Sequence, residues 1–312
     1  MLSSVSGLKV TGWGVALPDK IVTNDDLSIT LDTSDAWIRE RTGIRERRVG
    51  GSTAGLGSEA GARALEVAGL SGRDIDVVVL ATTTPDQVVP GTAPSIQAEL
   101  EIAGGAMDLN AACSGFVYGL VAAGGLLATG ARRVLLVGAE TLSRFVDWDD
   151  RSMAVLLGDG AGALVLEASD GESDLRSWNL GSDGSLKHLL ACDHGGTIHM
   201  DGQEVFRRAV RVVVDSATRA VADAGLTMDQ IDLLVPHQAN LRIIQAAAQR
   251  LGIEEERTAI VIDRYGNTSS ASIPLALVDA IEAGRVSAGD HLLLTGFGGG
   301  MTWASAVLRW SR

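Results

Sequence analysis

The stretch ARALEVAGLSGRDIDVVVLATT (62–83) occurs in a second, related copy, TRAVADAGLTMDQIDLLVPHQA (218–239), and this repeat decides the fold. The two copies align with an offset of 219 − 63 = 156 residues. Each copy is typical of a helix that stops at a glycine, a short turn and a buried strand. A second pair, RVLLVG (133–138) and HLLLTG (291–296), follows in the same order with an offset of 291 − 133 = 158. Chance similarity between common helix–turn–strand units is the alternative, but the shared order and spacing favour a duplicated α/β unit.

Helices alternate with apolar strands along both copies. This alternation predicts mixed, largely parallel sheets that are covered by helices. A polar segment, ASDGESDLRSW (168–178), marks the boundary between the copies. We therefore expect an N-terminal half over residues 1–170 and a C-terminal half over residues 171–312, packed together as one body.

Composition excludes several classes of protein. The chain has 312 residues, 46% of them hydrophobic, which is enough for a large core. Its net charge of −13 argues against a general binder of nucleic acid or membrane surfaces, although an acidic partner could dock on a local basic patch. No apolar run approaches the roughly 18 residues of a membrane span. The N-terminus MLSSVSGLKV lacks the apolar core of a signal peptide, so we expect a cytoplasmic protein.

Cys113 lies in DLNAACSGFVYGL (108–120), at the turn between a predicted strand and a predicted helix. A thiol at such a turn projects from the bend and faces the helix N-terminus, whose free N–H groups favour a thiolate. The chain has only two cysteines, so a disulfide framework is not expected. The pattern indicates a nucleophile, and a buried small hydrophobic side chain is the alternative.

Two further polar residues follow the same logic in the second half. His237 in VPHQANLRII (235–244) comes directly after a buried strand, and Asn267 in RYGNTSSASIPLAL (264–277) lies in a turn ahead of a helix. Adding 156 to 113 gives 269, two residues from Asn267, so a pseudo-twofold arrangement would bring the two turns face to face. Taken singly, His237 could be a satisfied core or surface histidine, and Asn267 a helix cap or turn former.

Two glycine-rich stretches have other interpretations. GFGGGMTW (296–303) could turn backbone N–H groups towards an oxyanion, or form a tight hairpin. GDGAGALVLE (158–167) lacks the third glycine of a dinucleotide-binding fingerprint and continues as a strand, which favours a strand hairpin.

Other clusters carry less information. Four potential metal ligands match no standard zinc spacing and favour a flexible loop over a metal site: His188, Cys192, His194 and His199. Arginines also gather locally, and although such runs are usually solvated faces, the guanidinium suits phosphate binding. These arginines lie in RERTGIRERR (39–48), at Arg207, Arg208 and Arg211, and at Arg242 and Arg250.

Taken together, six stretches resemble β-ketoacyl-[acyl carrier protein] synthase III, the thiolase-fold family that starts type II fatty acid synthesis. The resemblance runs over nearly the whole chain. It implies a five-layered αβαβα fold, a homodimer, and decarboxylative condensation of a starter acyl-CoA with malonyl-[acyl carrier protein] through an acyl-Cys113 intermediate. The stretches are DTSDAWIRERTGIRERR (32–48), AACSGF (111–116), GDGAGA (158–163), VPHQANLRII (235–244), YGNTSSAS (265–272) and FGGGMTW (297–303).

The resemblance also implies roles for individual residues. Cys113, His237 and Asn267 form the triad, and the asparagine favours the initiating class because elongating relatives use two histidines. Gly299 lies beside the Cys113 N–H in the oxyanion hole, and Phe297 beside the decarboxylation site. No metal or redox cofactor is expected. The coenzyme A contacts are Trp37 and Arg151 around the adenine, Arg41 and Arg242 near the phosphates or pantetheine, and Asn240; Arg207, Arg242 and Arg250 would dock the carrier protein.

Two departures from the family leave the starter chain open. The loop over about 185–199 looks short, and Val89 stands where some members carry Phe, on a loop that enters the partner subunit's acyl pocket in family dimers. A related ketosynthase or acyltransferase of specialised metabolism, with the same triad, is the first alternative function. A non-catalytic module that binds acyl-CoA or carrier protein is the second, and the intact triad argues against it.

Overall fold

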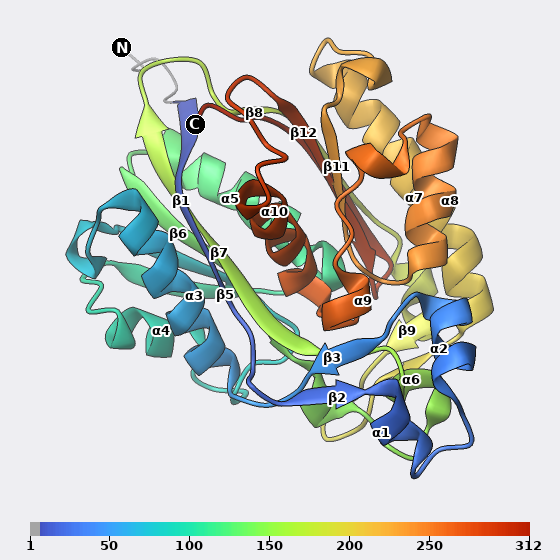
Figure 1. Ribbon diagram of the computed structural model, residues 1–312. Coiled ribbons are helices and arrows are strands. Elements are labelled where there is room, and N and C mark those ends of the chain that lie inside the picture. Colours follow the sequence, from blue (N-terminus) through green and yellow to red (C-terminus); the bar gives the residue numbers. More distant parts are fainter. Residues whose placement is uncertain (1–6) are drawn as a thin grey trace.

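Two sheets form the framework of the computed structural model, which describes residues 7–312 (Figure 1). The first sheet has the order β1-β7-β6-β4-β5 and the second the order β11-β12-β13-β8. The first six residues, part of the segment in which no signal peptide was expected, lie outside the described residues. The strands are β1 (Gly7–Ala16), β4 (Val77–Ala81), β5 (Gly105–Leu109), β6 (Arg133–Thr141), β7 (Asp159–Ser169), β8 (Leu175–Ser182), β11 (Leu233–Pro236), β12 (His291–Gly298) and β13 (Thr302–Arg309).

Helices occupy three layers around these sheets (Figure 1). α3 and α4 cover the outer face of the first sheet, α5 and α10 lie between the sheets, and α7 and α8 cover the outer face of the second. The predicted five-layered αβαβα architecture is therefore confirmed. The helices are α3 (Thr53–Ala68), α4 (Ala93–Glu99), α5 (Gly115–Ala128), α7 (Gly202–Asp223), α8 (Leu241–Leu251) and α10 (Ser272–Glu282).

The two sheets repeat one another strand by strand. In order across each sheet, β1, β7, β6 and β4 correspond to β8, β13, β12 and β11. The offsets are 233 − 77 = 156 between β4 and β11, and 291 − 133 = 158 between β6 and β12. The chain changes sheet between Ser169 and Leu175, the segment in which the sequence places the boundary between the halves.

The expectation of largely parallel sheets is wrong. β4–β5, β4–β6 and β11–β12 are parallel, but β1–β7, β6–β7, β12–β13 and β13–β8 are antiparallel. The reason is local at β12–β13, where the glycine run at 298–300 reverses the chain within a few residues, and a reversal that short can join only antiparallel strands. Residues 158–167 form a strand as expected, but not a hairpin, because β7 pairs with β1 and β6.

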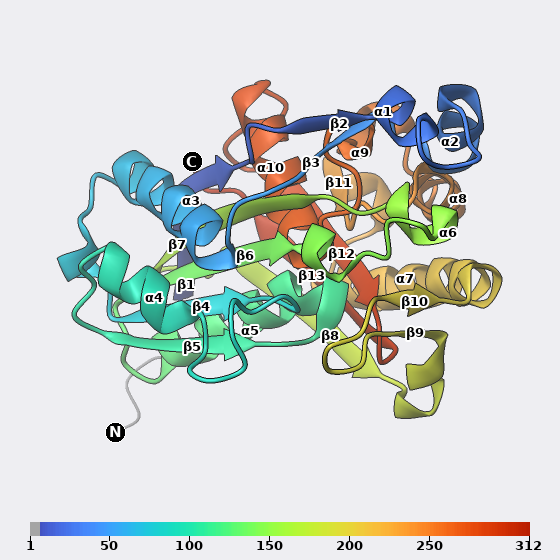
Figure 2. The ribbon, with the colours of Figure 1, turned by 90° about the horizontal axis from the view of Figure 1, so that it is seen from below.

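Shorter elements surround one end of the sheets (Figure 2). The segment 185–199, expected to be a flexible loop, contains a 3₁₀ helix (Gly184–Leu189) and the paired strands β9 and β10. No helix within residues 7–312 combines the length and apolarity needed to span a bilayer. The short elements are β2 (Ile21–Thr23), α1 (Asn24–Ser28), α2 (Asp35–Thr42), β3 (Glu46–Arg48), α6 (Arg151–Ala154), β9 (Leu190–Ala191), β10 (His199–Met200) and α9 (Ile262–Tyr265).

Candidate active site

Cys113 lies on a sharp 3₁₀ turn, Ala112–Ser114, between β5 and α5. We call this turn the first elbow. Ala112 has a φ of 48°, in the left-handed region that residues with a Cβ rarely adopt, and this conformation turns the chain abruptly into the helix. The elbow confirms the predicted strand-to-helix position of the thiol.

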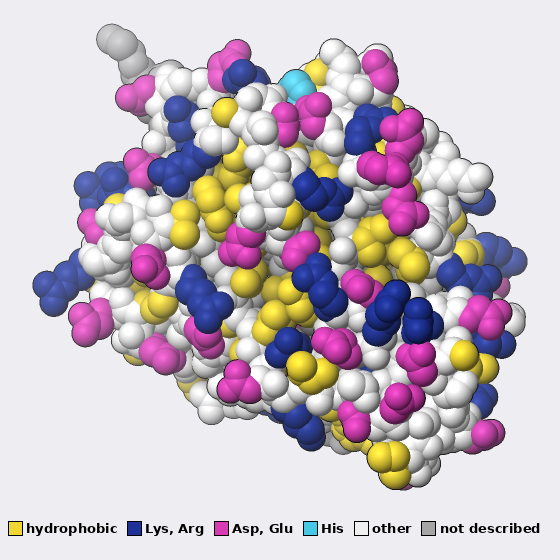
Figure 3. Space-filling view, viewed as in Figure 1, with side chains coloured by type: hydrophobic (Ala, Val, Ile, Leu, Met, Phe, Trp, Pro, Cys, Tyr) yellow, Lys and Arg dark blue, Asp and Glu magenta, His cyan; other side chains and the backbone are white. Residues whose placement is uncertain are grey.

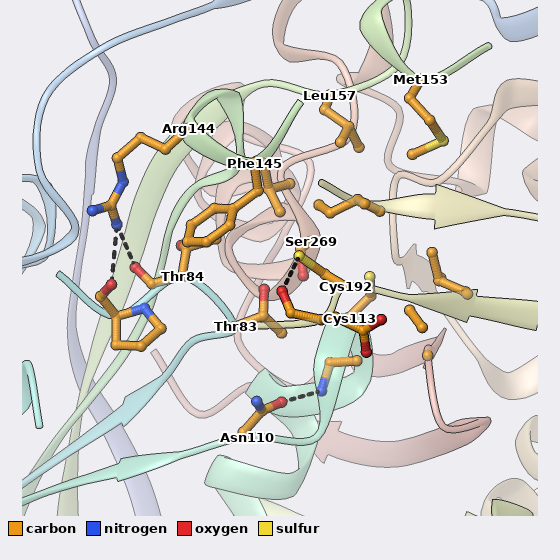
Figure 4. A pocket seen from close by; sticks show the side chains of 18 of the residues that line it. Thr83, Thr84, Asn110, Cys113, Arg144, Phe145, Met153, Leu157, Cys192 and Ser269 are labelled. Atoms are coloured by element: carbon orange, nitrogen blue, oxygen red, sulfur yellow. Dashed lines mark hydrogen bonds between the residues drawn. The ribbon is translucent and has the colours of Figure 1, made fainter. Parts of the chain in front are cut away.

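A cavity of about 670 Å³ opens beside Cys113 (Figure 4). One part of its wall is apolar and comes from the segment after β6, from α6 and from the β9–β10 region. Hydroxyl and amide groups form the part nearest the thiol. The lining includes Thr83, Thr84, Val88, Cys113, Leu142, Phe145, Met153, Leu156, Leu157, Leu190, Cys192, His194, Ile198, Met200, Asn267, Ser269 and Gly299.

His237 follows β11 directly and is 4% exposed. Burial lowers the pKa of its imidazole to about 3, so the ring is neutral. Its Nδ1 lies 2.7 Å from the Ser272 hydroxyl, and the Phe297 ring packs edge-on at 5.6 Å. Since a hydroxyl both donates and accepts, Ser272 supports either neutral tautomer, and Nε2 is the nitrogen left for substrate.

Asn267 is held by its own backbone and side chain. Its N–H donates to the Leu156 carbonyl, and its carbonyl accepts from the Gly158 N–H. Its Oδ1 accepts the Ser269 N–H at 2.9 Å. The oxygen of the amide is therefore committed, and the NH₂ group is left to donate into the cavity that Asn267 lines.

Strand β12 lies against both Cys113 and His237. A Cβ on Gly296 would lie 3.3 Å from the Cys113 carbonyl oxygen and 3.5 Å from the His237 Cβ, so this glycine lies between the two. A Cβ on Gly298 would lie 2.5 Å from the Cys113 backbone nitrogen. Gly299, the expected oxyanion-hole residue, lines the cavity with Cys113. The glycine run is thus both the β12–β13 turn and the close support of the thiol.

The expectation that Cys113 has a low pKa is wrong for this structure. Burial raises the pKa of the thiol to about 12; the Ser269 hydroxyl acts in the opposite sense, and the Glu140 carboxylate adds to the rise. Desolvation is the largest cause of this rise in the pKa. The resting site holds a neutral thiol and a neutral imidazole.

The expected coenzyme A residues lie outside the cavity lining, around Trp37 on α2. The guanidinium carbons of Arg41 and Arg151 lie 4.4 Å and 4.7 Å from the Trp37 ring centre. Trp37 packs against the same apolar cluster as Met153 and Leu157, which line the cavity. The structure therefore joins Trp37 and the two arginines into one basic, aromatic cluster beside the cavity, which we call the rim.

Asn240 has both polar groups engaged in the structure. Its Oδ1 caps α8 by accepting the Arg242 N–H at 2.9 Å, and its Nδ2 donates to the Arg41 carbonyl at 3.0 Å. It thus ties α8 to α2. Arg242 is exposed, with its guanidinium 5.8 Å from the Phe206 ring of α7.

The other expected docking arginines lie on α7 and α8. Arg207 and Arg208 both pair with Glu204, whereas Arg250 is exposed near the end of α8. On the face seen in Figure 3, basic side chains gather near α2, β3 and α9 with acidic side chains between them. Local basic groups therefore exist within the acidic surface of the chain.

Val89 is 83% exposed and does not line the cavity of its own subunit, whereas its neighbour Val88 does. His188 and His199 also lie outside the lining, while Cys192 and His194 are part of it. Within residues 7–312, no three His, Cys, Asp or Glu side chains come together as a metal-binding cluster.

Sequence reasoning missed two buried partners of the triad. Ser272 contacts His237, and Glu140 on β6 accepts hydrogen bonds from residues on both sides of the site. Glu140 could have been identified from the sequence, because it lies within an apolar strand, and a glutamate is rarely buried unless its carboxylate has partners. Ser272 could not, since a serine near a helix start is ordinarily a cap.

Known proteins resemble this chain along its whole length. Two family models, described as 3-oxoacyl-[acyl-carrier-protein (ACP)] synthase III and its C-terminal part, match residues 107–184 and 221–310. A beta-ketoacyl-[acyl-carrier-protein] synthase III from Roseiflexus sp. (strain RS-1) is 50% identical over 322 residues, covering 97% of this chain and 98% of the relative. The crystal structure of 3-oxoacyl-[acyl-carrier-protein] synthase III from Aquifex aeolicus VF5 is 45% identical, with a TM-score of 0.96 and coverage of 97% and 100%.

A priming beta-ketosynthase from the R1128 polyketide biosynthetic pathway is also similar, at 36% identity and a TM-score of 0.94, covering 99% of this chain and 97% of that one. The fold, the triad segments and the near-complete coverage agree. The chain therefore belongs to the β-ketoacyl-[acyl carrier protein] synthase III family.

Proposed function

We propose that this protein starts type II fatty acid synthesis by condensing a starter acyl-CoA with malonyl-[acyl carrier protein]. The observation that carries the proposal is that Cys113 and Asn267 line one cavity, while His237 and Cys113 both lie against Gly296 of β12. Each has the chemistry that its step requires. The scheme uses no metal or redox cofactor, and we assign the protein to the cytoplasm, where acyl-CoA is available.

In the first half-reaction the Cys113 sulfur attacks the carbonyl carbon of the acyl thioester. Because the thiol is neutral in the resting site, its proton must leave as the S–C bond forms, and the Nε2 lone pair of His237 can take it. The glycine run and the Cys113 N–H stabilise the oxyanion. Coenzyme A leaves as the thiolate, recovers the proton, and leaves acyl-Cys113 behind.

In the second half-reaction malonyl-[acyl carrier protein] loses carbon dioxide. Cleavage of the carboxylate bond leaves its electron pair as an enolate, whose oxygen accepts from the Asn267 NH₂ and from His237 in the tautomer protonated at Nε2. Phe297 keeps this corner apolar, which favours release of an uncharged product. The enolate carbon then attacks acyl-Cys113, and the cysteine sulfur leaves with the bonding electrons as a thiolate. A proton taken up from water then regenerates the thiol.

The rim would receive the nucleotide end of coenzyme A. Trp37 supplies an aromatic face for the adenine, and Arg41, Arg151 and Arg242 supply positive charge for the phosphates. Arg41 and Arg151 both lie over the Trp37 ring, so adenine stacking requires one of these guanidinium groups to move aside. Asn240 contributes by holding Arg41 against α8.

We propose that the protein is a homodimer through the free edge of β5. Met107 on this strand is 39% exposed, and the loop bearing Val88 and Val89, which are 79% and 83% exposed, lies against β5 through the bond from the Thr92 N–H to Asp108. A strand with one unpaired edge beside an apolar loop favours pairing with a second copy. Light scattering of wild type and Met107→Asp tests this; a monomeric wild type would contradict it.

Intact-mass spectrometry after incubation with a short acyl-CoA tests the proposed reaction. Wild type should gain one acyl group, Cys113→Ala none, and Cys192→Ala one, since Cys192 serves as the matched control. Adding malonyl-carrier protein should then remove the acyl group and release carbon dioxide. An unmodified wild type, or an equally modified Cys113→Ala, would overturn the proposal.

The similarity to a polyketide priming ketosynthase keeps a specialised-metabolism role as the second candidate. Its identity, 36%, is below the 50% and 45% of the two relatives named as [acyl-carrier-protein] synthase III. Comparing turnover with a fatty acid carrier protein and a polyketide carrier protein separates the two. Preference for the polyketide carrier would favour the second.

A further inference from the structure

The second half of the molecule contains a counterpart of the Cys113 elbow. The 3₁₀ turn Ser269–Ala271, which we call the second elbow, leads into α10 as the first elbow leads into α5. Ser269 has a φ of 47°, matching the 48° of Ala112, and 269 − 112 = 157. By the same offset, Ser270 takes the place of Cys113.

The two elbows pack reciprocally on the opposite sheets. A Cβ on Gly296 of β12 would lie 3.3 Å from the Cys113 carbonyl oxygen, and a Cβ on Gly138 of β6 would lie 2.6 Å from the Ser270 carbonyl oxygen. These glycines are themselves equivalent, since 296 − 138 = 158, the offset of the two strands.

The equivalence fails two residues further along each strand. Gly298 lies against the Cys113 backbone nitrogen, next to the open cavity. Its counterpart on β6 is Glu140, since 298 − 140 = 158. The Glu140 carboxylate faces the second elbow, accepting from the Ser270 hydroxyl at 2.8 Å and from the Ser270 N–H at 3.4 Å. A carboxylate oxygen thus meets the N–H that corresponds to the oxyanion-hole donor of Cys113.

Glu140 is fully buried, and its other contacts are also donors. Its carboxylate accepts from the Thr83 N–H at 3.1 Å and from the hydroxyls of Thr82, Thr83 and Thr84 at 3.3, 3.0 and 2.6 Å. Within residues 7–312, no Lys, Arg or His forms an ion pair with it. Hydrogen bonds to a carboxylate are stronger than neutral ones, so this shell fixes Glu140 and its donors firmly.

The donors come from both walls of the active site. Thr83 and Thr84 line the cavity on the side of the first half, and Ser270 adjoins Ser269, which lines it on the side of the second. The Ser269 N–H fixes the Asn267 side chain by donating to its Oδ1 at 2.9 Å. We infer that Glu140 is a positioning residue for decarboxylation, holding the second elbow so that Asn267 is correctly oriented.

This inference rests on the proposed function and assigns each of its half-reactions to a different elbow. The first elbow and its glycines carry acylation of Cys113, and the elbow held by Glu140 carries enolate stabilisation. Loss of the Glu140 carboxylate should therefore slow decarboxylation selectively. Asn267 takes no part in the acylation step, so displacement of its amide gives no reason for acylation to slow.

The test compares Glu140→Gln with wild type in both half-reactions. The Thr83 N–H lies 3.2 Å from Oε1 and 3.1 Å from Oε2 of Glu140. In Glu140→Gln one of these oxygens becomes an NH₂ group, which cannot accept a hydrogen bond from the Thr83 N–H. We therefore expect the backbone at Thr83 to be displaced. A displacement near 1 Å costs on the order of 10²-fold in rate. We expect carbon dioxide release from malonyl-carrier protein to fall about 10²-fold, while Cys113 acylation, followed by mass, stays within about threefold.

Asp174→Asn is the matched control. Asp174 is also buried and also accepts a backbone N–H, from Val10, and a hydroxyl, from Ser311, but it has no link to the second elbow. It should leave the ratio of the two half-reactions unchanged. Ser270→Ala, which keeps the carboxylate, should reproduce the selective loss more weakly and serves if Glu140→Gln does not fold.

Equal loss of both half-reactions, or no loss of either, in the folded Glu140 or Ser270 variant would overturn the inference. Selective loss in Asp174→Asn would overturn it as well, because the effect would then follow from any buried carboxylate. A wild type that is acylated but releases no carbon dioxide would instead overturn the proposed function, and the inference with it.

Discussion

The catalytic end of the cavity and its rim are built on opposite physical principles. At the catalytic end, Cys113 and His237 are desolvated and neutral, with pKa values near 12 and 3. At the rim, Trp37 is stacked by two charged guanidinium groups that remain in contact with water. A buried donor is worth far more than an exposed charge, since water does not compete with it. Substitutions at the catalytic end should therefore act on rate, and those at the rim on binding and its salt dependence.

The largest effect should come from Asn267→Ala. The Ser269 N–H holds the Asn267 amide oxygen, so the Asn267 NH₂ group is the part that can donate to substrate. The substitution therefore removes one oxyanion-type donor. Decarboxylation of malonyl-carrier protein should fall by about 10² to 10³. Acylation of Cys113, measured by mass, should persist, since Asn267 takes no part in that step.

His237→Ala is the companion variant that sharpens the comparison. Because the thiol is neutral, removing the base should slow acylation as well as decarboxylation. Carbon dioxide release near the wild-type rate in either variant would refute the assigned roles. Normal acylation in His237→Ala would show that another group takes the Cys113 proton.

The rate of Cys113 alkylation should report the neutral thiol directly. With a pKa near 12, the thiolate fraction rises about tenfold for each pH unit from 7 to 10 without reaching a plateau. Iodoacetamide labelling, read from the Cys113 and Cys192 peptides of the same digest, measures this. A plateau below pH 9 would instead indicate the low-pKa thiolate that the sequence pattern alone suggests.

Arg242→Glu should have a smaller effect, because it reverses a single exposed charge on α8. Reversing an exposed charge changes the encounter with an acidic carrier protein by about tenfold at low salt, and less at high salt. KM for malonyl-carrier protein should rise while acylation by a small acyl thioester is unchanged. Arg73→Glu, which reverses an equally exposed charge in the first half, is the control. An unchanged KM at low ionic strength would place the docking surface elsewhere.

Val89→Phe should have the smallest effect, a shift in starter preference towards acetyl-CoA. Filling the space of each methylene in a partner's acyl pocket changes discrimination by about fourfold, from about 0.8 kcal/mol per methylene. The measurement is the ratio of kcat/KM for acetyl-CoA to that for a branched acyl-CoA. Ile29→Phe, at another highly exposed apolar position, is the control. If the ratio does not move, Val89 does not line the pocket.

Much of this fold can be predicted from the sequence, because the duplication is visible as a sequence repeat. The 156-residue repeat identifies two equivalent halves, and the offset from Cys113 leads to the turn that holds Asn267. It does not give strand direction, because a buried strand reads the same whether its neighbour is parallel or antiparallel. The β12–β13 reversal is visible only as a glycine run, which indicates a ligand loop equally well.

The chemistry of the site is less predictable than its residues. Position relative to a helix suggested a thiolate at Cys113, but the pKa depends on how much water the folded structure excludes, which no local pattern records. Ser272 and Glu140 act through contacts with residues 35 and 130 positions away in sequence. Such partners become visible only when the two halves are docked.

The burial that keeps Cys113 protonated has a consequence for the lifetime of the enzyme. Peroxides react with thiolates rather than thiols, so a nucleophile that is almost never ionised at rest is a poor target for oxidation to sulfenic acid. The sulfur becomes reactive only while substrate and His237 are in place to take its proton. We therefore expect peroxides to oxidise Cys113 slowly at rest.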